Sequence, residues 1–474
     1  MDNLHARGII RRIVVEGDLR LCSPAHVGNG EIGEDVDLPI ARHPADGNPI
    51  LRGDSIAGAM RSWLHEYQYG YGATATAAPV HALLFGGEAE DPEGALSPLI
   101  VDDALLDGEG TVERRDGVAI NPQNGTAERK LKFDREFLES GQIFPLRFEL
   151  VVTDKTDSAL VPLLSLVLSA FEAGDIRIGA RKMRGFGRAI ADGWRVRTFD
   201  ATTPRGIGGW LTYDDAQRLT TAAAPAADCL AAPFVLDDRR RWIDVSAEFT
   251  LNESIMIRSD SPALEDISLD DPDDVHLRSR RDGRLEYVVS GTSLAGTLRS
   301  RARRITRARG WEEGLVDSVF GFVSKTNGAA SRLAVEEAVV PSAAAVPLVQ
   351  ARTQIEELTG GSFAGALFSE QALFAAGAPF SLSFRLRQSS QGDPDSREAA
   401  LLMLLLKDLW TGDLPIGGAS SIGRGTLSGQ TASITRRYDR VDTRFSLRQT
   451  TAGLDGDLVL LENLCAPSGQ GVAA

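Results

Sequence analysis

The 474-residue sequence has little that would cross-link it or anchor it in a membrane. Its three cysteines, Cys22, Cys229 and Cys465, are far apart and odd in number, so they form neither a disulfide framework nor a zinc pattern. The longest apolar run, 160–171, is interrupted by a proline and two serines and predicts a buried helix rather than a membrane span. The first twelve residues lack the apolar stretch of a signal peptide. These absences favour a cytoplasmic protein.

Basic residues are outnumbered by acidic ones, and the net charge of -15 speaks against a nonspecific nucleic-acid binder. Binding nevertheless depends on where the basic residues lie. One cluster falls in a short loop and comprises Arg177, Arg181, Lys182, Arg184 and Arg188. A second falls in a predicted helix and comprises Arg299, Arg301, Arg303, Arg304, Arg307 and Arg309. The helical cluster is equally consistent with a solvated helix face.

Four segments recur in the same order, which indicates an internal duplication. Residues 53–61 match 291–299, both with the pattern Gly-x-Ser followed by an apolar residue and, at the end, arginine. Residues 84–104 match 319–338, 144–150 match 380–386, and 178–187 match 416–425. The offsets are about 238, 235, 236 and 238 residues, and so nearly constant a spacing is hard to explain without duplication. The Ala- and Pro-rich stretch Thr220–Pro233 predicts a linker. We therefore divide the chain into a first repeat, 1–236, and a second repeat, 237–474.

Each repeat predicts the same order of elements. A strand with alternating apolar residues comes first (Ile9–Leu21; Trp242–Ile257), and a helix follows the Gly-x-Ser segment. Asp54 or Ser55 would cap the first of these helices, and Thr292 or Ser293 the second. A second alternating strand (Phe144–Val152; Phe380–Leu386) then precedes an apolar helix (Ala159–Ala173; Ala399–Trp410) that ends at a glycine. This order predicts an α+β fold of two tandem ferredoxin-like or RRM-like domains, each with its helices on one face of an antiparallel sheet.

The glycine-rich loops and the helices after Gly-x-Ser are candidate phosphate sites. Glycine lets backbone N–H groups approach an anion, helix N-termini attract phosphates, and arginine adds charge-assisted donors. A tight strand connection and an ordinary capped helix are the alternative explanations. Aromatics are only 6% of the chain, so RNA would be bound through loops and phosphates rather than by base stacking. The candidates are Gly53, Ser55, Arg61, Gly179, Arg181, Lys182, Arg184, Gly185, Gly187, Arg188, Ser293, Arg299, Gly417, Gly418, Gly423 and Arg424.

Together these motifs resemble the RAMP superfamily, and within it the backbone (Cas7-type) subunits of type III CRISPR effector complexes. The resemblance covers nearly the whole chain apart from the linker and the C-terminal tail. It implies two RAMP domains that bind the guide RNA (crRNA), mainly through its backbone, along a filament. It also implies a thumb-like insertion in each repeat, wedged between guide and target RNA, which we place at 117–134 and 352–368.

Several subunits of this family cleave the paired target RNA through an aspartate in the first loop, so the resemblance further implies such a residue here. In the first repeat Asp37 stands before Leu38 and Pro39, as the family pattern requires. The second repeat lacks Asp-x-Pro, so either Asp273 or Asp274 could be the equivalent, or the second repeat could bind RNA without cutting it. The reaction would be metal-assisted attack of a ribose 2′-OH on its own phosphodiester, with Mg²⁺ or Mn²⁺ as the divalent ion. The acidic residues 31–37 could equally form an ordinary surface loop.

Two other functions stay open at this stage. The chain could be a scaffold that binds crRNA without cutting, or a guide-processing endoribonuclease, a class that often uses a histidine as general base, for which His26 is the candidate. The implied partners are crRNA, complementary target RNA and other type III subunits: a Cas10-like large subunit, other RAMP subunits and a small subunit. The sequence does not identify the metal or the position in such a complex.

Overall fold

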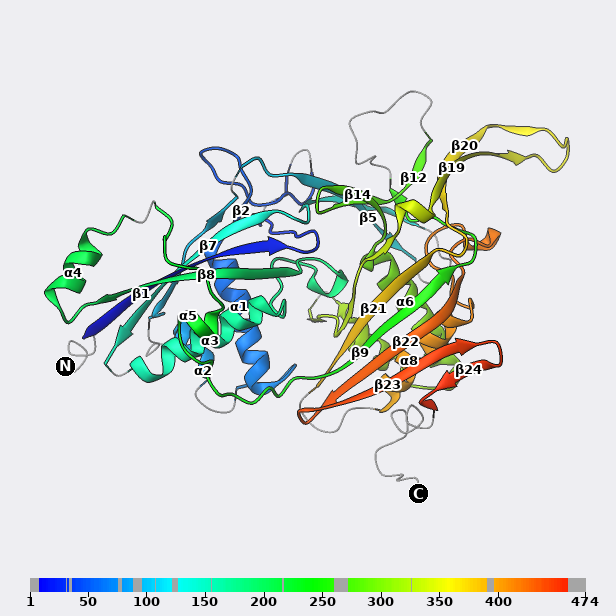
Figure 1. Cartoon of the computed structure of the whole chain (residues 1–474). Helices are drawn as coiled ribbons and strands as arrows, with labels where there is room; N and C mark the ends of the chain where they lie inside the picture. Colours follow the sequence, from blue (N-terminus) through cyan, green and yellow to red (C-terminus); the bar gives the residue numbers. More distant parts are fainter. Residues whose placement is uncertain are drawn as a thin grey trace, which may run out of the picture.

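The computed structural model describes residues 8–30, 32–33, 36–75, 79–87, 96–106, 108–121, 127–154, 156–214, 217–259, 272–324, 326–389 and 396–458. Figure 1 shows the two repeats side by side, each with its own twisted sheet. Among the helices of these residues, none is long and apolar enough to cross a membrane.

The first repeat folds around a four-stranded antiparallel sheet. Its strands are β1 (Ile9–Leu21), β3 (Leu99–Val101), β7 (Ile143–Thr153) and β8 (Ala189–Asp200), in the order β3-β7-β1-β8. Helices α1 (Gly53–Tyr69) and α3 (Asp157–Glu172) connect them, so the chain order is strand, helix, two strands, helix, strand. This order and topology are those of a ferredoxin-like fold.

The second repeat has the same core with two further strands at one edge. The sheet order is β17-β21-β9-β22-β23-β24. The bounds are β9 (Arg241–Leu251), β17 (Leu333–Val335), β21 (Pro379–Gln388), β22 (Leu427–Tyr438), β23 (Val441–Thr450) and β24 (Gly453–Gly456). Helices α6 (Gly291–Arg309) and α8 (Ser396–Trp410) take the places of α1 and α3. The predicted α+β fold class is therefore confirmed in both halves, whereas the division at residue 236 stays a prediction.

Buried apolar residues alternate with less buried ones along the central strands, so each repeat forms its own hydrophobic core. In β9, Ile243, Val245, Ala247 and Phe249 are fully or almost fully buried, whereas the residues between them face the other side of the sheet. The apolar residues of α8 pack on the same face. Strand β1 and α3 form a separate core in the first repeat. Burial of apolar area is the main favourable term in folding, so each sheet is held to its own two helices.

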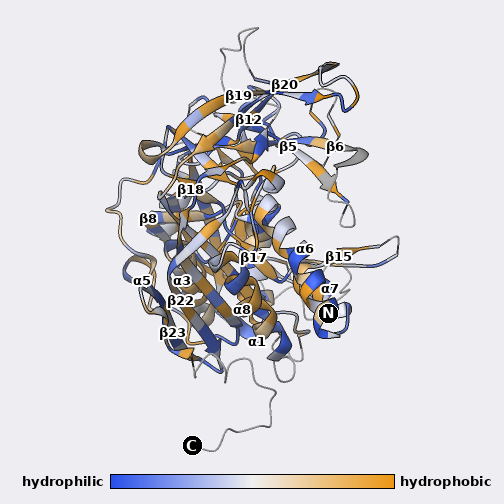
Figure 2. Ribbon diagram, turned by 90° about the vertical axis from the view of Figure 1, so that its right-hand side faces the viewer, coloured by the Kyte–Doolittle hydropathy of each residue, from blue (hydrophilic) through white to orange (hydrophobic). Residues whose placement is uncertain are grey.

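Each repeat also carries a long two-stranded hairpin where a thumb insertion is predicted. These are β5 (Val112–Ile120) with β6 (Ala127–Leu138), and β19 (Val346–Ile355) with β20 (Ser362–Phe374). Both lie on the same side of the molecule, away from the C-terminal end of the described chain, as the two views agree (Figures 1 and 2). The first hairpin is rich in charge, whereas the second exposes apolar side chains such as Leu348 and Leu367.

Smaller elements complete the two halves. In the first they are β2 (Ile50–Leu51), α2 (Val80–Phe85), β4 (Ala104–Leu105), η1 (Lys182–Arg184), α4 (Pro204–Leu211) and α5 (Ala226–Cys229). In the second they are β10 (Ser254–Ile255), β11 (Arg258–Ser259), β12 (Asp274–His276), β13 (Arg278–Arg281), β14 (Arg284–Val289), α7 (Gly314–Phe320), β15 (Phe322–Val323), β16 (Gly328–Ala329), β18 (Ala338–Val340), η2 (Ser342–Ala344) and η3 (Ser420–Ile422).

Two local predictions are wrong. The stretch 220–233 is not a free linker, because Ala226 in α5 is fully buried and the Ser165 hydroxyl donates to the Ala231 carbonyl at 2.7 Å. The helix caps are also different. Helix α1 begins at Gly53, whose N–H donates to the Asp103 carboxylate at 2.6 Å, and α6 is capped by the Ser290 hydroxyl, which accepts from the Ser293 N–H. Gly291 rather than Thr292 therefore opens that helix.

The indole of Trp194 lies directly against Gly17, which sits at a register shift between β1 and β8. A Cβ at Gly17 would overlap the fully buried ring. We therefore expect Gly17→Ala to lower the free energy of unfolding by about 1–3 kcal/mol, as overpacking does in cores. Gly208→Ala is the matched control, because Gly208 lies in α4 with open space around it and alanine is the better helix former. Chemical denaturation measures both; equal stabilities would contradict the assigned packing.

Candidate functional site

The glycine-rich loops of the two repeats have one backbone conformation. Residues 179–187 match 417–425, with positive φ at the equivalent positions Gly179 and Gly417 (79° and 83°) and at Arg181 and Ala419 (57° and 60°). A 3₁₀ turn follows each left-handed residue. A left-handed conformation is costly for any residue with a Cβ. Its presence at two non-glycine positions shows that the surrounding structure imposes this turn.

Both loops are tied to the first loop of their own repeat by the same hydrogen bonds. The Ala180 N–H donates to the His26 carbonyl at 2.8 Å, and the Gly418 N–H donates to the Met256 carbonyl at 2.7 Å. The next tie joins Gly187 to the Pro24 carbonyl and Gly425 to the Ser254 carbonyl. The glycine-rich loop therefore fixes the chain that leads from the first strand into the predicted catalytic loop.

Asp37 is braced against the hairpin of its own repeat by reciprocal hydrogen bonds. The Asp37 N–H donates to the Asp134 carboxylate at 2.7 Å, and the Asp134 N–H donates to the Asp37 carboxylate at 3.0 Å. Leu38 then pairs with Arg135 as a parallel bridge. Asp134 also pairs with Arg114. The loop aspartate thus stands at the base of the thumb-like hairpin.

Asp273 has the same arrangement in the second repeat. The Ser369 N–H donates to its carboxylate at 2.8 Å, and the Asp273 N–H donates to the Ser369 hydroxyl at 3.3 Å. The following residue, Asp274, pairs with Glu370 in a parallel bridge, as Leu38 does with Arg135. Asp274 also forms an ion pair with Arg258 at 3.2 Å. Of the two candidates that the sequence left open, Asp273 is therefore the positional equivalent of Asp37.

In the first repeat, two guanidinium groups next to the hairpin residues Phe133 and Asp134 have no carboxylate partner among the described residues. Arg135 and Arg181 both face the ring of Phe133, at 5.9 and 5.6 Å from its centroid. No carboxylate of the described residues forms an ion pair with either group. Burial and the neighbouring Arg181 charge lower the pKa of Arg135 to about 10. An anion between them would relieve both penalties, so the pair is a candidate phosphate site.

Sequence reasoning missed Arg135 and Phe133 as members of this site. The signal that could have found them is strand alternation, because residues two apart in β6 point to the same face. In the second repeat the position of Arg135 is held by Glu370, whose side chain is 1% exposed. Arg424, Arg352 and Arg258 surround that carboxylate at 2.7, 3.0 and 3.7 Å, and Arg258 also pairs with Asp274, so guanidinium groups line this site as well.

Several predicted phosphate-binding groups already have protein partners. The Arg424 guanidinium is buried and donates to Glu370 and Gln350. Arg184 donates to Ser331 and to the Leu333 carbonyl, and Arg299 pairs with Asp317 at 3.2 Å. These three guanidiniums hold the fold together in this structure.

The backbone donors at the helix ends are taken as well. The Gly53 N–H donates to Asp103 and the Ser293 N–H to Ser290. The other candidates differ in exposure. The exposed ones are Arg181, Arg188 and Gly423, and the partly exposed ones are Ser55, Arg61, Lys182, Gly417 and Gly418. Close backbone or side-chain neighbours surround Gly179, Gly185 and Gly187.

The arginines of helix α6 mostly form ion pairs. Arg301 pairs with Asp408, Arg303 with Asp317 at 3.9 Å, and Arg307 with Glu313. Surface pairs of this kind hold charge locally and contribute little. The cluster fits a solvated, ion-paired helix face better than a phosphate-binding face.

His26 is a structural residue in this fold. Its ring is 6% exposed, its Nδ1 lies 2.8 Å from the Glu136 carbonyl, and its face packs edge-on against Phe137. Burial lowers the pKa of His26, which favours the neutral ring. A ring so enclosed has little access to a substrate ribose, and this weighs against a guide-processing reaction that uses His26 as base.

Within the described part of the chain, no group of three or more histidine, cysteine, aspartate or glutamate side chains could hold a metal ion. Asp37 and Asp134 are nevertheless adjacent, and Mg²⁺ commonly binds to one or two carboxylates together with substrate phosphate oxygens. The oxygen-only donor set therefore fits Mg²⁺ or Mn²⁺ if RNA completes the coordination.

Fold and site together define a protein of two tandem ferredoxin-like domains, each with a loop aspartate braced against a hairpin. The family model of the RAMP superfamily matches residues 18–190 and 248–428, one region in each repeat. The chain belongs to the RAMP superfamily, and this membership suggests a CRISPR-associated, RNA-binding role. No curated protein matches the sequence.

His276, in the first loop of the second repeat, gives the fold a pH dependence. The ring is 1% exposed, its Nδ1 accepts the Ile257 N–H at 3.2 Å, and burial lowers its pKa to about 4. The unfolded chain therefore binds more protons below pH 6.5, and stability falls as the pH drops from about 6.5 to about 4. The expected loss is about 3 kcal/mol.

His276→Asn keeps an acceptor near the Ile257 N–H but does not titrate, so it should lose less stability over the same range. Denaturant unfolding at pH 7 and pH 4.5 measures the difference. The control is His43→Asn, whose wild-type ring lies in a surface loop beside Asp46. Identical pH dependence in His276→Asn and the wild type would contradict the assignment.

Proposed function

We propose that this protein is a guide-RNA-binding backbone subunit of a type III CRISPR effector complex and that it cleaves the paired target RNA. The observation that carries the proposal is the repeated bracing of a loop aspartate at the base of a hairpin, Asp37 in the first repeat and Asp273 in the second. Two equivalent aspartates on one chain fit cleavage at two places along one RNA. The proposed surroundings are a reducing cytoplasm, and the proposed partners are crRNA, target RNA and the other subunits of the complex.

RNA backbone would be bound by the two guanidiniums of the first repeat that have no carboxylate partner among the described residues. Arg135 and Arg181 both contact the ring of Phe133, and Arg135 directly follows Asp134, the residue of β6 that braces Asp37. Phosphate held there would bring a neighbouring ribose toward the loop. The hairpins β5–β6 and β19–β20 are the candidate thumbs. Distortion of the guide–target duplex beside them would turn a ribose 2′-OH of the target strand toward the phosphorus of the adjacent phosphodiester.

The proposed reaction is transesterification within the target strand. The 2′-oxygen forms a bond to phosphorus, the bond to the 5′-oxygen breaks, and the leaving 5′-oxygen takes up a proton from water, so the products are a 2′,3′-cyclic phosphate and a 5′-hydroxyl. Asp37 or Asp273 would accept the 2′-OH proton or orient it for departure. A divalent ion, Mg²⁺ or Mn²⁺, held by the aspartate and RNA oxygens, would neutralise charge on the phosphate.

A scaffold that binds RNA without cutting is the competing function, and one observation favours it. The Asp37 carboxylate already accepts a hydrogen bond from the hairpin, which is a structural task in itself. Asparagine can perform this task through its Oδ1 but is neither a base nor a good ligand for a hard cation. The pair of variants Asp37→Asn and Asp37→Ala therefore separates a catalytic from a structural role of Asp37, and a wild-type complex that leaves its target RNA uncut would identify the scaffold.

We expect Asp37→Asn to reduce cleavage of a target RNA at the corresponding position by at least about 100-fold, because general-base catalysis contributes that much or more. Asp273→Asn should do the same at the second position, whereas Asp274→Asn should retain cleavage. Guide binding by all three should match the wild type, as measured by filter binding. Cleavage is measured in the assembled complex on end-labelled target RNA. Full activity of Asp37→Asn together with a defective Asp37→Ala would establish the scaffold role for this residue.

We further expect Arg135→Ala and Arg181→Ala to weaken the binding of single-stranded guide RNA and to make it less sensitive to salt. Each lost phosphate contact should reduce the slope of log affinity against log salt by about 0.7. Arg304→Ala removes the same charge from the exposed face of α6 and is the matched control. Titrations between about 50 and 300 mM salt give the slopes. An equal change in the control would mean that RNA responds only to overall charge.

A further inference from the structure

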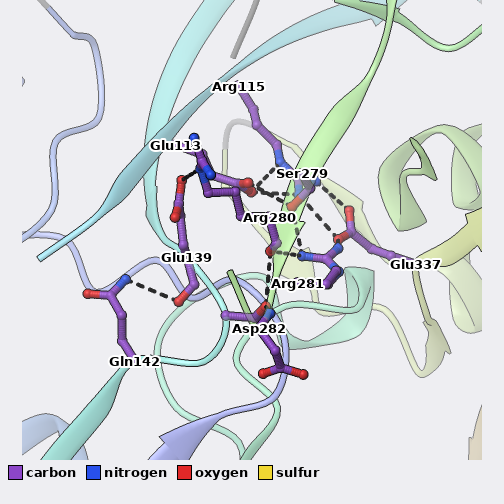
Figure 3. A network of polar contacts seen from close by, with 10 residues as sticks. Glu113, Arg115, Glu139, Gln142, Ser279, Arg280, Arg281, Asp282 and Glu337 are labelled. Atoms are coloured by element: carbon purple, nitrogen blue, oxygen red, sulfur yellow. Dashed lines mark hydrogen bonds and ion pairs between the residues drawn. The ribbon is translucent and has the colours of Figure 1, made fainter. Parts of the chain in front are cut away.

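The two faces of the first hairpin meet different parts of the molecule. Arg115 of β5 points into the joint between the two repeats, where Figure 3 shows it bonded to Ser279 and Glu337 of the second repeat. The side chains of Arg115 and Glu337 are 7% and 4% exposed, and buried charges of this kind persist only when each has its partner. Arg114 lies on the opposite face, because successive side chains of a strand alternate, and it pairs there with Asp134. The hairpin that carries Asp134 is therefore held against the second repeat.

The face of the first hairpin that meets the loop aspartate is rich in carboxylates. The Asp134 carboxylate accepts the Asp37 N–H at 2.7 Å, and the Asp37 carboxylate accepts the Asp134 N–H at 3.0 Å. Asp116 stands directly opposite Asp134 in the β5–β6 ladder, so the two side chains lie on one face. Glu136, two residues further along β6, accepts from the Ile40 N–H at 3.1 Å. Of these hairpin carboxylates, Asp134 is the one bonded to Asp37.

The same face of the second hairpin is uncharged. The bridges Leu38–Arg135 and Asp274–Glu370 align the two hairpins, so Ser369 takes the place of Asp134. The uncharged residues of this face are Val349, Ala351, Leu367, Ser369 and Gln371. By the same alignment they replace Arg114, Asp116, Lys132, Asp134 and Glu136 of the first hairpin.

Asp273 therefore meets a hydroxyl where Asp37 meets a carboxylate. The Ser369 hydroxyl lies 3.3 Å from the Asp273 backbone nitrogen and 3.3 Å from the Asp273 carboxylate. The neighbouring carboxylate in that loop, Asp274, pairs with Arg258 at 3.2 Å. Hard cations prefer charged oxygen ligands, and their affinity for a site rises with the number of carboxylates that the site supplies. The two loop aspartates thus differ in what stands beside them to help hold a cation.

We propose that Asp134 is a second metal-binding carboxylate of the first cleavage site, and that the two sites of this chain therefore differ in their demand for the divalent ion. The first site holds Mg²⁺ or Mn²⁺ through Asp37 and Asp134 together with RNA oxygens, whereas the second relies on Asp273 and RNA oxygens. The target RNA is therefore cut at its first position at a lower metal concentration than at its second. This inference rests on the proposed function, because it concerns the metal used in that reaction.

The ion pair between Arg114 and Asp134 is compatible with this role. The Arg114 side chain is 45% exposed, and ion pairs at the surface contribute little to stability. An RNA phosphate competes for the same guanidinium, since phosphate oxygens accept strong, charge-assisted hydrogen bonds from arginine. Transfer of Arg114 to the RNA backbone would leave an Asp134 oxygen available to the cation.

The first test measures the Mg²⁺ concentration for half-maximal cleavage at each position of one target RNA in the assembled complex. In the wild type this concentration should be about tenfold lower at the first position. Asp134→Ser provides the hydroxyl that Ser369 offers to Asp273, so it should keep the Asp37 N–H bonded while raising the first value about tenfold. Ser369→Asp should lower the second value by a similar factor. Asp228→Ser removes an exposed carboxylate of α5 and should change neither value.

Equal Mg²⁺ demand at the two positions of the wild type would overturn the inference and leave the proposed function intact. So would an Asp134→Ser variant that leaves both values unchanged. A wild-type complex that cuts neither position would instead count against the proposed function, and a measurement of metal binding then decides the inference.

The second test follows metal binding without cleavage. The full chain is bound to guide RNA and to a complementary RNA with 2′-deoxyribose at the scissile positions, and Mn²⁺ binding is measured by electron paramagnetic resonance. Compared with the wild type, Asp134→Ser should weaken the binding of one Mn²⁺ about tenfold, and Ser369→Asp should strengthen the binding of one by a similar factor. Asp228→Ser should match the wild type. Identical Mn²⁺ titrations for the wild type and Asp134→Ser would show that Asp134 only braces Asp37.

Discussion

The left-handed turn of the glycine-rich loop is the constraint on which the rest of each repeat depends. Gly187 and Gly425 adopt positive φ, and a Cβ at either would overlap a carbonyl oxygen, that of Ile178 or Ile416. Only glycine allows this close approach. The turn carries the N–H groups that hold the first loop, and the first loop in turn places its aspartate against the hairpin. The candidate site therefore rests on backbone geometry more than on side-chain packing.

The two repeats share this backbone geometry but carry different side chains at equivalent positions. Phe186 stacks on Phe137 in the first repeat, and the equivalent position in the second is Arg424, buried against Glu370. In one repeat an aromatic pair supports the loop; in the other a buried ion pair does so. Both solutions place guanidinium groups near the loop aspartate. Guanidinium groups from different residues lie at the same place in both repeats, as expected if that place binds an anionic ligand.

The acidic net charge of the chain and its proposed affinity for RNA are compatible because the arginines have unequal roles. Many of them are committed to carboxylates, as Arg115, Arg301 and Arg424 are. Arg135 and Arg181 have no such partner among the described carboxylates and stand together beside Phe133. Counting charges along the sequence cannot separate these groups. The field that a bound RNA would meet is set largely by the few guanidiniums without an ion pair in the described part of the chain.

The sequence by itself determined the local elements. The first strand runs over the predicted Ile9–Leu21, a glycine with positive φ lies two residues after the end of each apolar helix, and the sequence repeat predicted the same fold twice. Alternation, helical periodicity and the φ preferences of glycine all act within a few residues, so the sequence records them. Tertiary structure alone decided that Asp273 rather than Asp274 matches Asp37, and that Arg135 and Arg181 both contact the ring of Phe133. It also decided that Arg184 donates to the Leu333 carbonyl of the second repeat. Each of these contacts joins groups that are about 45 to 150 residues apart in the sequence. The match of Asp273 to Asp37 also depends on how the first loop pairs with the hairpin, which the sequence spacing does not give. Distances across the fold are fixed by packing, which no local pattern records.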